Sequence, residues 1–60
     1  MTNLRSIIKE ILREGEYTTQ EIQKKISYKV DEEILEETLI RLINEEQIVY
    51  LGKSKWSLVA

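Results

Sequence analysis

Carboxylates, hydroxyls and lysines are the side chains of this 60-residue chain that could do chemistry, because it contains neither histidine nor cysteine. Acidic residues recur at the spacing of one helical turn, Glu32 with Glu36 and Glu33 with Glu37. Two such carboxylates make only a weak divalent-cation site, and the usual zinc sites need cysteine or histidine. Open helix faces supply no activated nucleophile and no acid or base with a tuned pKa. We therefore predict a binding module and not an enzyme, with no catalytic residue, metal site, cofactor or small-molecule substrate.

Five lysines are the candidates for contact with nucleic acid. They fall into two groups along the chain, Lys24, Lys25 and Lys29, then Lys53 and Lys55. Residues 31–47 hold seven acids and one base, a net charge of −6, whereas the rest of the chain holds four acids and eight bases, a net charge of +4. We expect an electrically two-sided molecule that meets any nucleic acid with its lysine side. The alternative is that these lysines only keep a helix face and a hairpin tip soluble.

Length and composition indicate one domain over residues 1–60. Apolar residues make up 42% of the chain and charged residues 33%, which is typical of a globular protein rather than a disordered segment. A chain this short buries only roughly 60% of the surface that it exposes when unfolded, so its core is thin. The apolar runs are too short for a membrane span or a secretory signal, so we expect a cytoplasmic protein with no membrane partner.

Two helices are predicted in the first half of the chain. The first is capped by Asn3 or Thr2 and ends at Gly15. Its apolar face consists of Leu4, Ile7, Ile8, Ile11 and Leu12, at the spacing of one helix face. The second helix is expected to begin near position 19, because Thr18 and Glu21 have the spacing of a capping box. Its narrow apolar stripe consists of Ile22 and Ile26. Residues 16–18 between the two helices are predicted as a short strand.

A third helix is expected to begin after Asp31 and to continue to about residue 46. Asp31 suits the N-cap position, and Val30 and Leu35 then occupy the two positions of a hydrophobic staple. The core stripe consists of Leu35, Leu39, Leu42 and Ile43. At 100° per residue, Ile34 and Ile40 project away from this stripe. Residues 27–29 before this helix are predicted as a tight turn.

The hydrophobic period changes from 3.6 to 2 after this helix. Residues 48–51 and 56–59 therefore predict the two strands of a β-hairpin, joined by a loop at residues 52–55. The face that the strands share is expected to carry Ile48, Tyr50, Trp56 and Leu58. Two strands alone are marginally stable, so the hairpin must pack on the helices. Trp56 is accordingly predicted to be part of the core rather than to stack on a nucleic-acid base.

This order of elements resembles the winged helix-turn-helix family over almost the whole chain. The residues that carry the resemblance are Thr18, Thr19, Gln20, Glu21, Ile22, Val30, Leu39, Leu42 and Ile48. The spacing of Val30, Leu39 and Leu42 follows the family pattern, whereas Gln47 stands where the family usually has a helix-ending glycine. The resemblance implies a small α+β fold whose C-terminal hairpin is the wing and whose third helix lies in the DNA major groove.

The third helix has the wrong charge for that role. The positions that the resemblance places in the groove are Asp31, Glu32, Glu33, Ile34, Glu36 and Glu37, of which five are acidic. Carboxylates repel phosphates and accept few base-edge donors. Our first hypothesis is a small regulator or accessory subunit of a transcription or replication assembly that contacts DNA through the wing and second-helix lysines. The competing hypothesis is a protein-interaction module whose third helix docks on a basic partner or on a second copy of the chain. Its docking residues are Glu33, Ile34, Glu36, Glu37 and Ile40.

Overall fold

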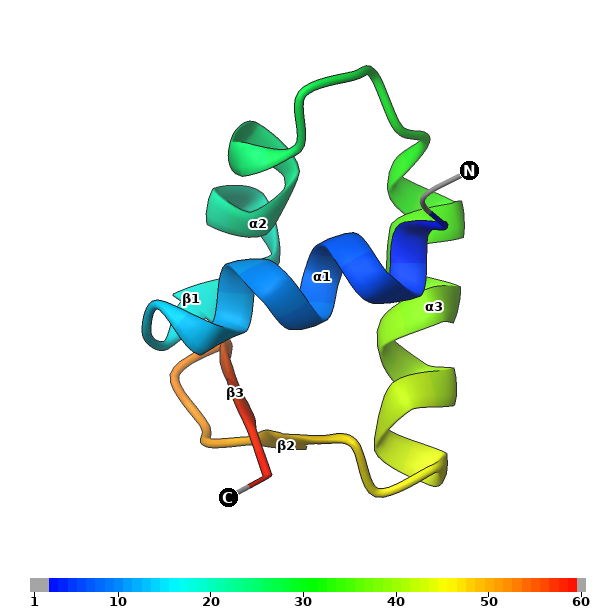
Figure 1. Cartoon of the computed structure of the whole chain (residues 1–60). Helices are drawn as coiled ribbons and strands as arrows, with labels where there is room; N and C mark the ends of the chain where they lie inside the picture. Colours follow the sequence, from blue (N-terminus) through cyan, green and yellow to red (C-terminus); the bar gives the residue numbers. More distant parts are fainter. Residues whose placement is uncertain (1–2, 60) are drawn as a thin grey trace.

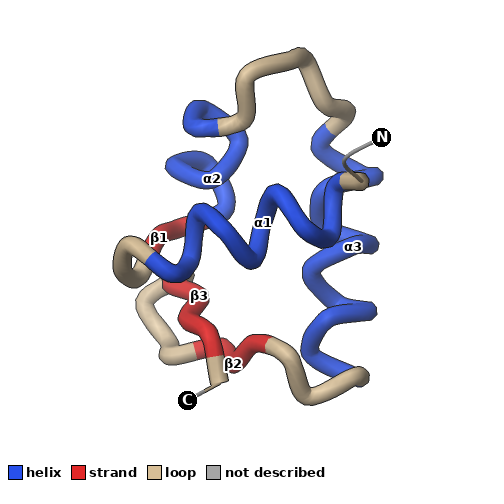
Figure 2. The backbone as a smooth tube through the Cα atoms, in the orientation of Figure 1, coloured by secondary structure: helices blue, strands red, loops and turns tan. Residues whose placement is uncertain are grey.

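Three helices and a three-stranded antiparallel sheet form the chain in the computed structural model, which describes residues 3–59. In chain order the elements are α1 (Leu4–Arg13), β1 (Tyr17–Thr18), α2 (Thr19–Lys25), α3 (Glu32–Asn44), β2 (Ile48–Tyr50) and β3 (Lys55–Leu58). Helix α1 runs between α2 and α3, and the short strands lie together at one end of the molecule (Figure 1, Figure 2). The predicted element order and the small α+β class are confirmed.

The first two helices begin at side chains that cap their first turns. The side-chain oxygen of Asn3 accepts a hydrogen bond from the Ser6 amide at 2.9 Å, so Asn3 is the N-cap of α1. The alternative cap, Thr2, lies outside the described residues. In α2 the Thr18 hydroxyl accepts from the Glu21 amide at 3.2 Å, and the Glu21 carboxylate accepts from the Thr18 amide at 2.9 Å. The predicted capping box is therefore confirmed. It gives hydrogen-bond acceptors to backbone amides at the start of α2, which have no carbonyl partner within the helix.

Helix α3 also begins as predicted. The Asp31 carboxylate accepts a hydrogen bond from the Glu33 amide at 2.9 Å. Val30 and Leu35, on either side of this cap, are both buried in the core. This is the arrangement of a hydrophobic staple, which fixes the angle at which the chain enters the helix.

The end of α3 differs from the prediction. The helix stops at Asn44 rather than near residue 46, and the residue in the left-handed conformation is Glu46, with a φ of 61°, and not Gln47. The Glu46 amide donates to the Ile43 carbonyl and the Gln47 amide to the Leu42 carbonyl, both at 2.9 Å. These two bonds form a Schellman motif, which places the left-handed residue two positions after the last helical one. The family resemblance therefore misplaced the helix end by one residue.

The connection between α2 and α3 is longer than the tight turn predicted at residues 27–29. It spans the six residues 26–31 and forms the wide loop at the top of Figure 1. Ile26 and Val30 are buried near its two ends, and the Gln23 side-chain amide donates to the Val30 carbonyl at 2.9 Å. Ile26 and Val30 both enter the core from non-helical backbone. A helical spacing pattern therefore does not predict the length of this loop.

Strand β3 is the central strand, with β1 and β2 antiparallel on its two sides. The β2–β3 pairs are Ile48 with Leu58, Val49 with Ser57, and Tyr50 with Trp56. The predicted shared face is therefore confirmed, although Tyr50 remains 53% exposed. The sequence places Lys55 in the hairpin loop, but the structure makes it the first residue of β3, opposite Thr18 of β1. Pairing with β1 extends the strand by this residue.

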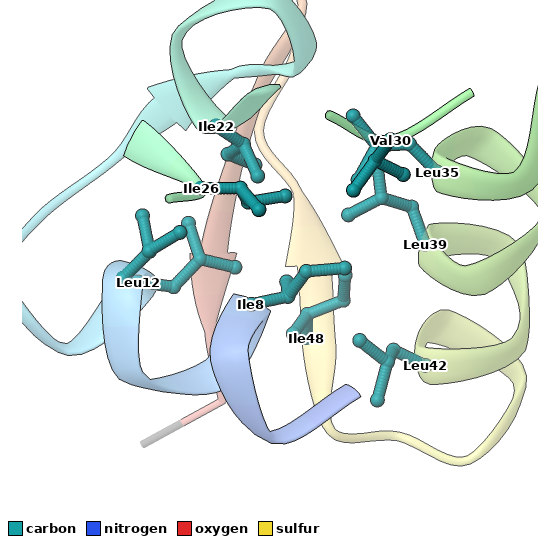
Figure 3. Packing of buried hydrophobic residues seen from close by; sticks show 10 residues of the cluster. Ile8, Leu12, Ile22, Ile26, Val30, Leu35, Leu39, Leu42 and Ile48 are labelled. Carbon is teal, nitrogen blue, oxygen red and sulfur yellow. The ribbon is translucent and has the colours of Figure 1, made fainter. Parts of the chain in front are cut away.

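One aliphatic cluster joins the three helices to the sheet (Figure 3). Its ten buried members are Ile8, Ile11, Leu12, Ile22, Ile26, Val30, Leu35, Leu39, Leu42 and Ile48. Most of these residues belong to the predicted helix stripes, and Val30 and Ile48 come from the predicted staple and hairpin face. The stripe residues Leu4, Ile7 and Ile43 are only partly buried, at the margin of the cluster. Trp56 is also partly buried and packs against the cluster, so its predicted core position is only partly confirmed. Among the described residues no polar side chain is buried, so aliphatic packing provides most of the stability.

We predict that Leu39→Ala destabilises the protein by about 2 to 5 kcal/mol, because Leu39 is fully buried and the substitution leaves a cavity. Thermal melting followed by circular dichroism measures the effect. Ile40→Ala is the matched control, since Ile40 is the next residue on α3 and is 56% exposed. An unchanged melting temperature for Leu39→Ala would show that the core face of α3 is wrongly assigned.

Candidate nucleic-acid interface

The lysines and arginines of this chain differ in what they contact. Each arginine forms an ion pair, Arg5 with Glu45, Arg13 with Glu10, and Arg41 with Glu37. The five lysines predicted to bind nucleic acid are all exposed, and none of them has an ion-pair partner within residues 3–59. They are Lys24, Lys25, Lys29, Lys53 and Lys55. The remaining lysine, Lys9, donates to the side chain of Gln47 at 3.0 Å. The five exposed lysines are therefore the cations that the described fold leaves available to a partner.

Strand β1 brings lysines from α2 and from the hairpin together. The Lys25 ammonium lies 4.6 Å from the centroid of the Tyr17 ring, a cation–π contact. Lys55 is paired across the sheet with Thr18, the neighbour of Tyr17. Both lysines also act electrostatically on the carboxylate of Glu21. Lys25 and Lys55 are far apart in the sequence, but the fold places them on one surface.

The other three lysines lie on α2 and in the two loops that follow it in the chain. Lys24 follows Gln20 by one turn of α2, Lys29 lies in the α2–α3 connection, and Lys53 lies in the hairpin loop. In Figure 1 the hairpin loop, drawn in orange, lies on the same side of the molecule as α2 and β1, with α3 on the opposite side. We call the surface of Lys25 and Lys55, together with the exposed lysines Lys24, Lys29 and Lys53 of α2 and the two loops, the basic face.

Glu21 is the acid within the basic face. Its pKa is held below the ordinary glutamate value first by the hydrogen bond from the Thr18 backbone amide, while partial desolvation opposes this effect. The Thr18 side chain and the positive charges of Lys55 and Lys25 lower the pKa further. The ionised carboxylate therefore caps α2 and also balances part of the charge of two lysines.

The hairpin loop has an unusual backbone. The Lys55 amide donates to the Gly52 carbonyl at 3.0 Å, and the two residues between them, Lys53 and Ser54, have positive φ angles of 51° and 64°. Positive φ at both central residues is the feature of type I′ hairpin turns, where asparagine and glycine are favoured. Lysine and serine adopt this conformation at a cost, and the hydrogen bond from the Ser54 amide to the Tyr50 hydroxyl, at 3.0 Å, helps to hold it.

An open depression of about 330 Å³ lies beside the basic face. Its lining residues come from the start of α2, the start of α3 and the hairpin loop, and they are Thr18, Thr19, Gln20, Glu32 and Ser54. The Trp56 indole N–H donates to the Thr19 hydroxyl at 2.9 Å and so joins the hairpin to the start of α2. This group is not predictable from the sequence, since no spacing pattern places Glu32 near Ser54. The expected separation of charge is therefore incomplete, because an acid of α3 reaches the depression.

The exposed side of α3 carries the residues of the competing hypothesis. Glu33, Ile34, Glu36, Glu37 and Ile40 are all exposed. Ile34 and Ile40 are 55% and 56% exposed, but at 100° per residue their positions lie about 120° apart around the helix. The two isoleucines therefore form no single apolar stripe, and a partner that covers both must span the arc that contains Glu33 and Glu37.

Two further features bear on the kind of site. Within residues 3–59 no three acidic side chains come together in a group that could hold a metal ion, so Glu32, Glu33, Glu36 and Glu37 stay spread along α3. Every helix in this part of the chain is also too short and too polar to span a bilayer.

We predict that Glu21→Gln reduces the loss of stability on acidification. A carboxyl whose folded pKa is lowered stabilises the fold above its unfolded pKa, and this contribution is lost as the pH falls through the folded pKa. Glutamine keeps the capping box but does not titrate. The difference in melting temperature between about pH 6 and about pH 3 should therefore be smaller in Glu21→Gln than in the wild type. Glu16→Gln, an exposed acid outside the capping box, is the control. An unchanged pH difference in Glu21→Gln would contradict the assigned role.

Comparison of the chain with protein-family models, with characterised proteins and with solved structures finds no significant match. Function must therefore be argued from the geometry of the basic face, the depression and the exposed side of α3.

Proposed function

We propose that this chain is a winged helix-turn-helix module that binds nucleic acid through its basic face, with the hairpin β2–β3 as the wing. The observation that carries the proposal is that all five exposed lysines lack ion-pair partners in the described residues while each arginine has one. Lysines of this kind bind phosphates as point charges, and the release of counterions from the nucleic acid drives binding. The element order and the β1–β3–β2 sheet support the family assignment.

The acidic helix α3 determines the orientation of the complex in this proposal. Glu33 and Glu36 are exposed along the helix, and Glu32 lines the depression beside the hairpin loop. Carboxylates at these positions repel phosphates, so the wing leads the approach and α3 stays out of the major groove. This orientation differs from the docking that is usual for the family, in which the third helix reads the bases. A module that binds in this way suits a small regulator or an accessory subunit of a transcription or replication assembly.

We predict that Lys53→Glu combined with Lys55→Glu weakens binding to duplex DNA by more than about tenfold, since two phosphate contacts become repulsive. Fluorescence anisotropy with a labelled random-sequence duplex at low salt measures the affinity. With about three to five phosphates neutralised, the slope of log affinity against log salt should be about −3 to −4 for the wild type, at ~0.9 per phosphate. The double charge reversal should flatten this slope.

Glu33→Gln combined with Glu36→Gln is the matched control on α3. Because it removes repulsion, it should tighten binding modestly and create no sequence preference. If the wing reversal changes nothing and the α3 neutralisation abolishes binding, α3 reads bases through its carboxylates and the proposed orientation is wrong. Absence of wild-type binding at low salt would contradict the proposed function itself.

A second candidate function is favoured by the exposure of Ile34 and Ile40 on an acidic helix. In this alternative, α3 docks on a basic protein partner or on a second copy of the chain, whose own basic face offers complementary charge. The isoleucines then contribute apolar contacts at the two flanks of the arc that contains Glu33 and Glu37.

For this second function we predict that Ile34→Asp combined with Ile40→Asp abolishes association and leaves the fold nearly intact, because both side chains are more than half exposed. Sedimentation velocity of the wild type and the variant measures self-association, and circular dichroism measures folding. A wild-type protein that stays monomeric at high concentration excludes the second-copy form of this function. Unfolding of the variant would show that one isoleucine contributes to the core.

A further inference from the structure

The wing carries an exposed aromatic ring in a defined orientation. Tyr50 is 53% exposed although it shares the sheet face of the buried Ile48. Its ring meets Trp56 edge-on, with the ring centroids 4.9 Å apart and the planes at 62°. Its hydroxyl accepts a hydrogen bond from the Ser54 amide at 3.0 Å. The ring is therefore held both at its side and at its hydroxyl, while about half of the residue faces solvent.

The strained loop of the hairpin is hydrogen-bonded to this ring and carries or adjoins two lysines. Lys53 and Ser54 both adopt positive φ angles, and backbone strain of this kind is concentrated at binding and catalytic sites. The hydrogen bond from Ser54 to Tyr50 couples the strained backbone directly to the ring. Lys53 and Lys55 stand on either side of Ser54 in the chain, and both are exposed and without an ion-pair partner in residues 3–59.

The aromatic pair is hydrogen-bonded to two residues of the depression. Ser54, which bonds to Tyr50, and Thr19, which bonds to Trp56, both line it. The lining is polar and contains three hydroxyl groups, one amide and the carboxylate of Glu32. The exposed ring is therefore connected, through Ser54, to a depression with hydrogen-bonding side chains.

We infer that the wing binds single-stranded nucleic acid, with one unpaired base stacked on Tyr50 and adjacent phosphates on Lys53 and Lys55. This inference rests on the proposed function and specifies the form of nucleic acid. Stacking on an exposed aromatic ring needs a base whose face is free, and bases within a duplex are covered by their neighbours. The acids of α3 oppose insertion of the helix into a duplex groove, whereas a single strand can follow the wing alone. A basic groove next to an aromatic platform is the combination that binds single strands without sequence preference.

The test compares three labelled ligands of equal length with the full chain at low salt: oligo(dT), an abasic strand with the same phosphates, and a random-sequence duplex. The wild type should bind oligo(dT) about 5- to 100-fold more tightly than the abasic strand, because only oligo(dT) offers a base to stack. Trp56 is the sole tryptophan, and it touches Tyr50, so oligo(dT) should quench its emission and the abasic strand should not.

Substitutions of Tyr50 identify the stacking ring. Tyr50→Leu should lower the affinity for oligo(dT) by about 5- to 100-fold, and it should change the affinities for the abasic strand and the duplex no more than Tyr50→Phe does, since both variants lose the hydrogen bond to the loop. Tyr50→Phe keeps the ring, loses the hydrogen bond to Ser54, and should show a smaller decrease. Circular dichroism checks the folding of both variants. If Tyr50→Leu does not fold, the comparison of oligo(dT) with the abasic strand on the wild-type protein decides the matter.

The two possible failures are distinguishable. Equal affinities of the wild type for oligo(dT) and the abasic strand, or an unchanged affinity of folded Tyr50→Leu for oligo(dT), would overturn base stacking and leave phosphate binding by the lysines in place. A wild-type protein that binds none of the three ligands would overturn the proposed function together with this inference.

Discussion

Packing of aliphatic side chains is the interaction on which the rest of this structure depends. The chain has no cysteine for a disulfide, and its described residues bury no polar side chain, so one cluster of isoleucine, leucine and valine holds the elements together. Helix α2 has only seven residues and β1 only two, and neither length is stable alone in water. They persist because Ile22 is buried in the cluster and because β1 pairs with β3. The positions of the lysines on α2 and on the hairpin are therefore a consequence of core packing.

Charge is distributed over this framework in two different ways. The arginines are paired with glutamates at short range, and one of these pairs, Arg5 with Glu45, ties the start of α1 to the end of α3. The lysines of α2 and the hairpin are left without such partners in the described residues. Exposed ion pairs contribute little to stability, so this difference affects binding more than folding. In the proposed function, these unpaired lysines attract a nucleic acid and the acids of α3 repel it.

In the hairpin, several residues depart from the backbone conformation and the burial that are usual for their type. Lysine and serine occupy left-handed positions that suit asparagine and glycine, and Tyr50 keeps half of its surface in solvent although it shares a face with core residues. Hydrogen bonds from Ser54 to Tyr50 and from Trp56 to Thr19 connect these features to the start of α2. Departures of this kind from local preference are expected where a surface serves binding rather than stability. They make the hairpin the best candidate for contact with a ligand.

The sequence by itself determined where the helices begin and which faces they bury, because caps and apolar stripes are local chemistry. The capping box at Thr18, the cap at Asp31 and the apolar stripe through Leu39 all act over a few residues, and spacing alone reveals them. Only the tertiary structure decided that the hairpin loop and the start of α2 line one depression. Likewise, only the packing of the other elements against the hairpin decided that Tyr50 remains exposed. Lys55 comes near Glu21 and the surface of Lys25 because β1 pairs with β3, and such long-range pairing leaves no periodic signal in a single sequence.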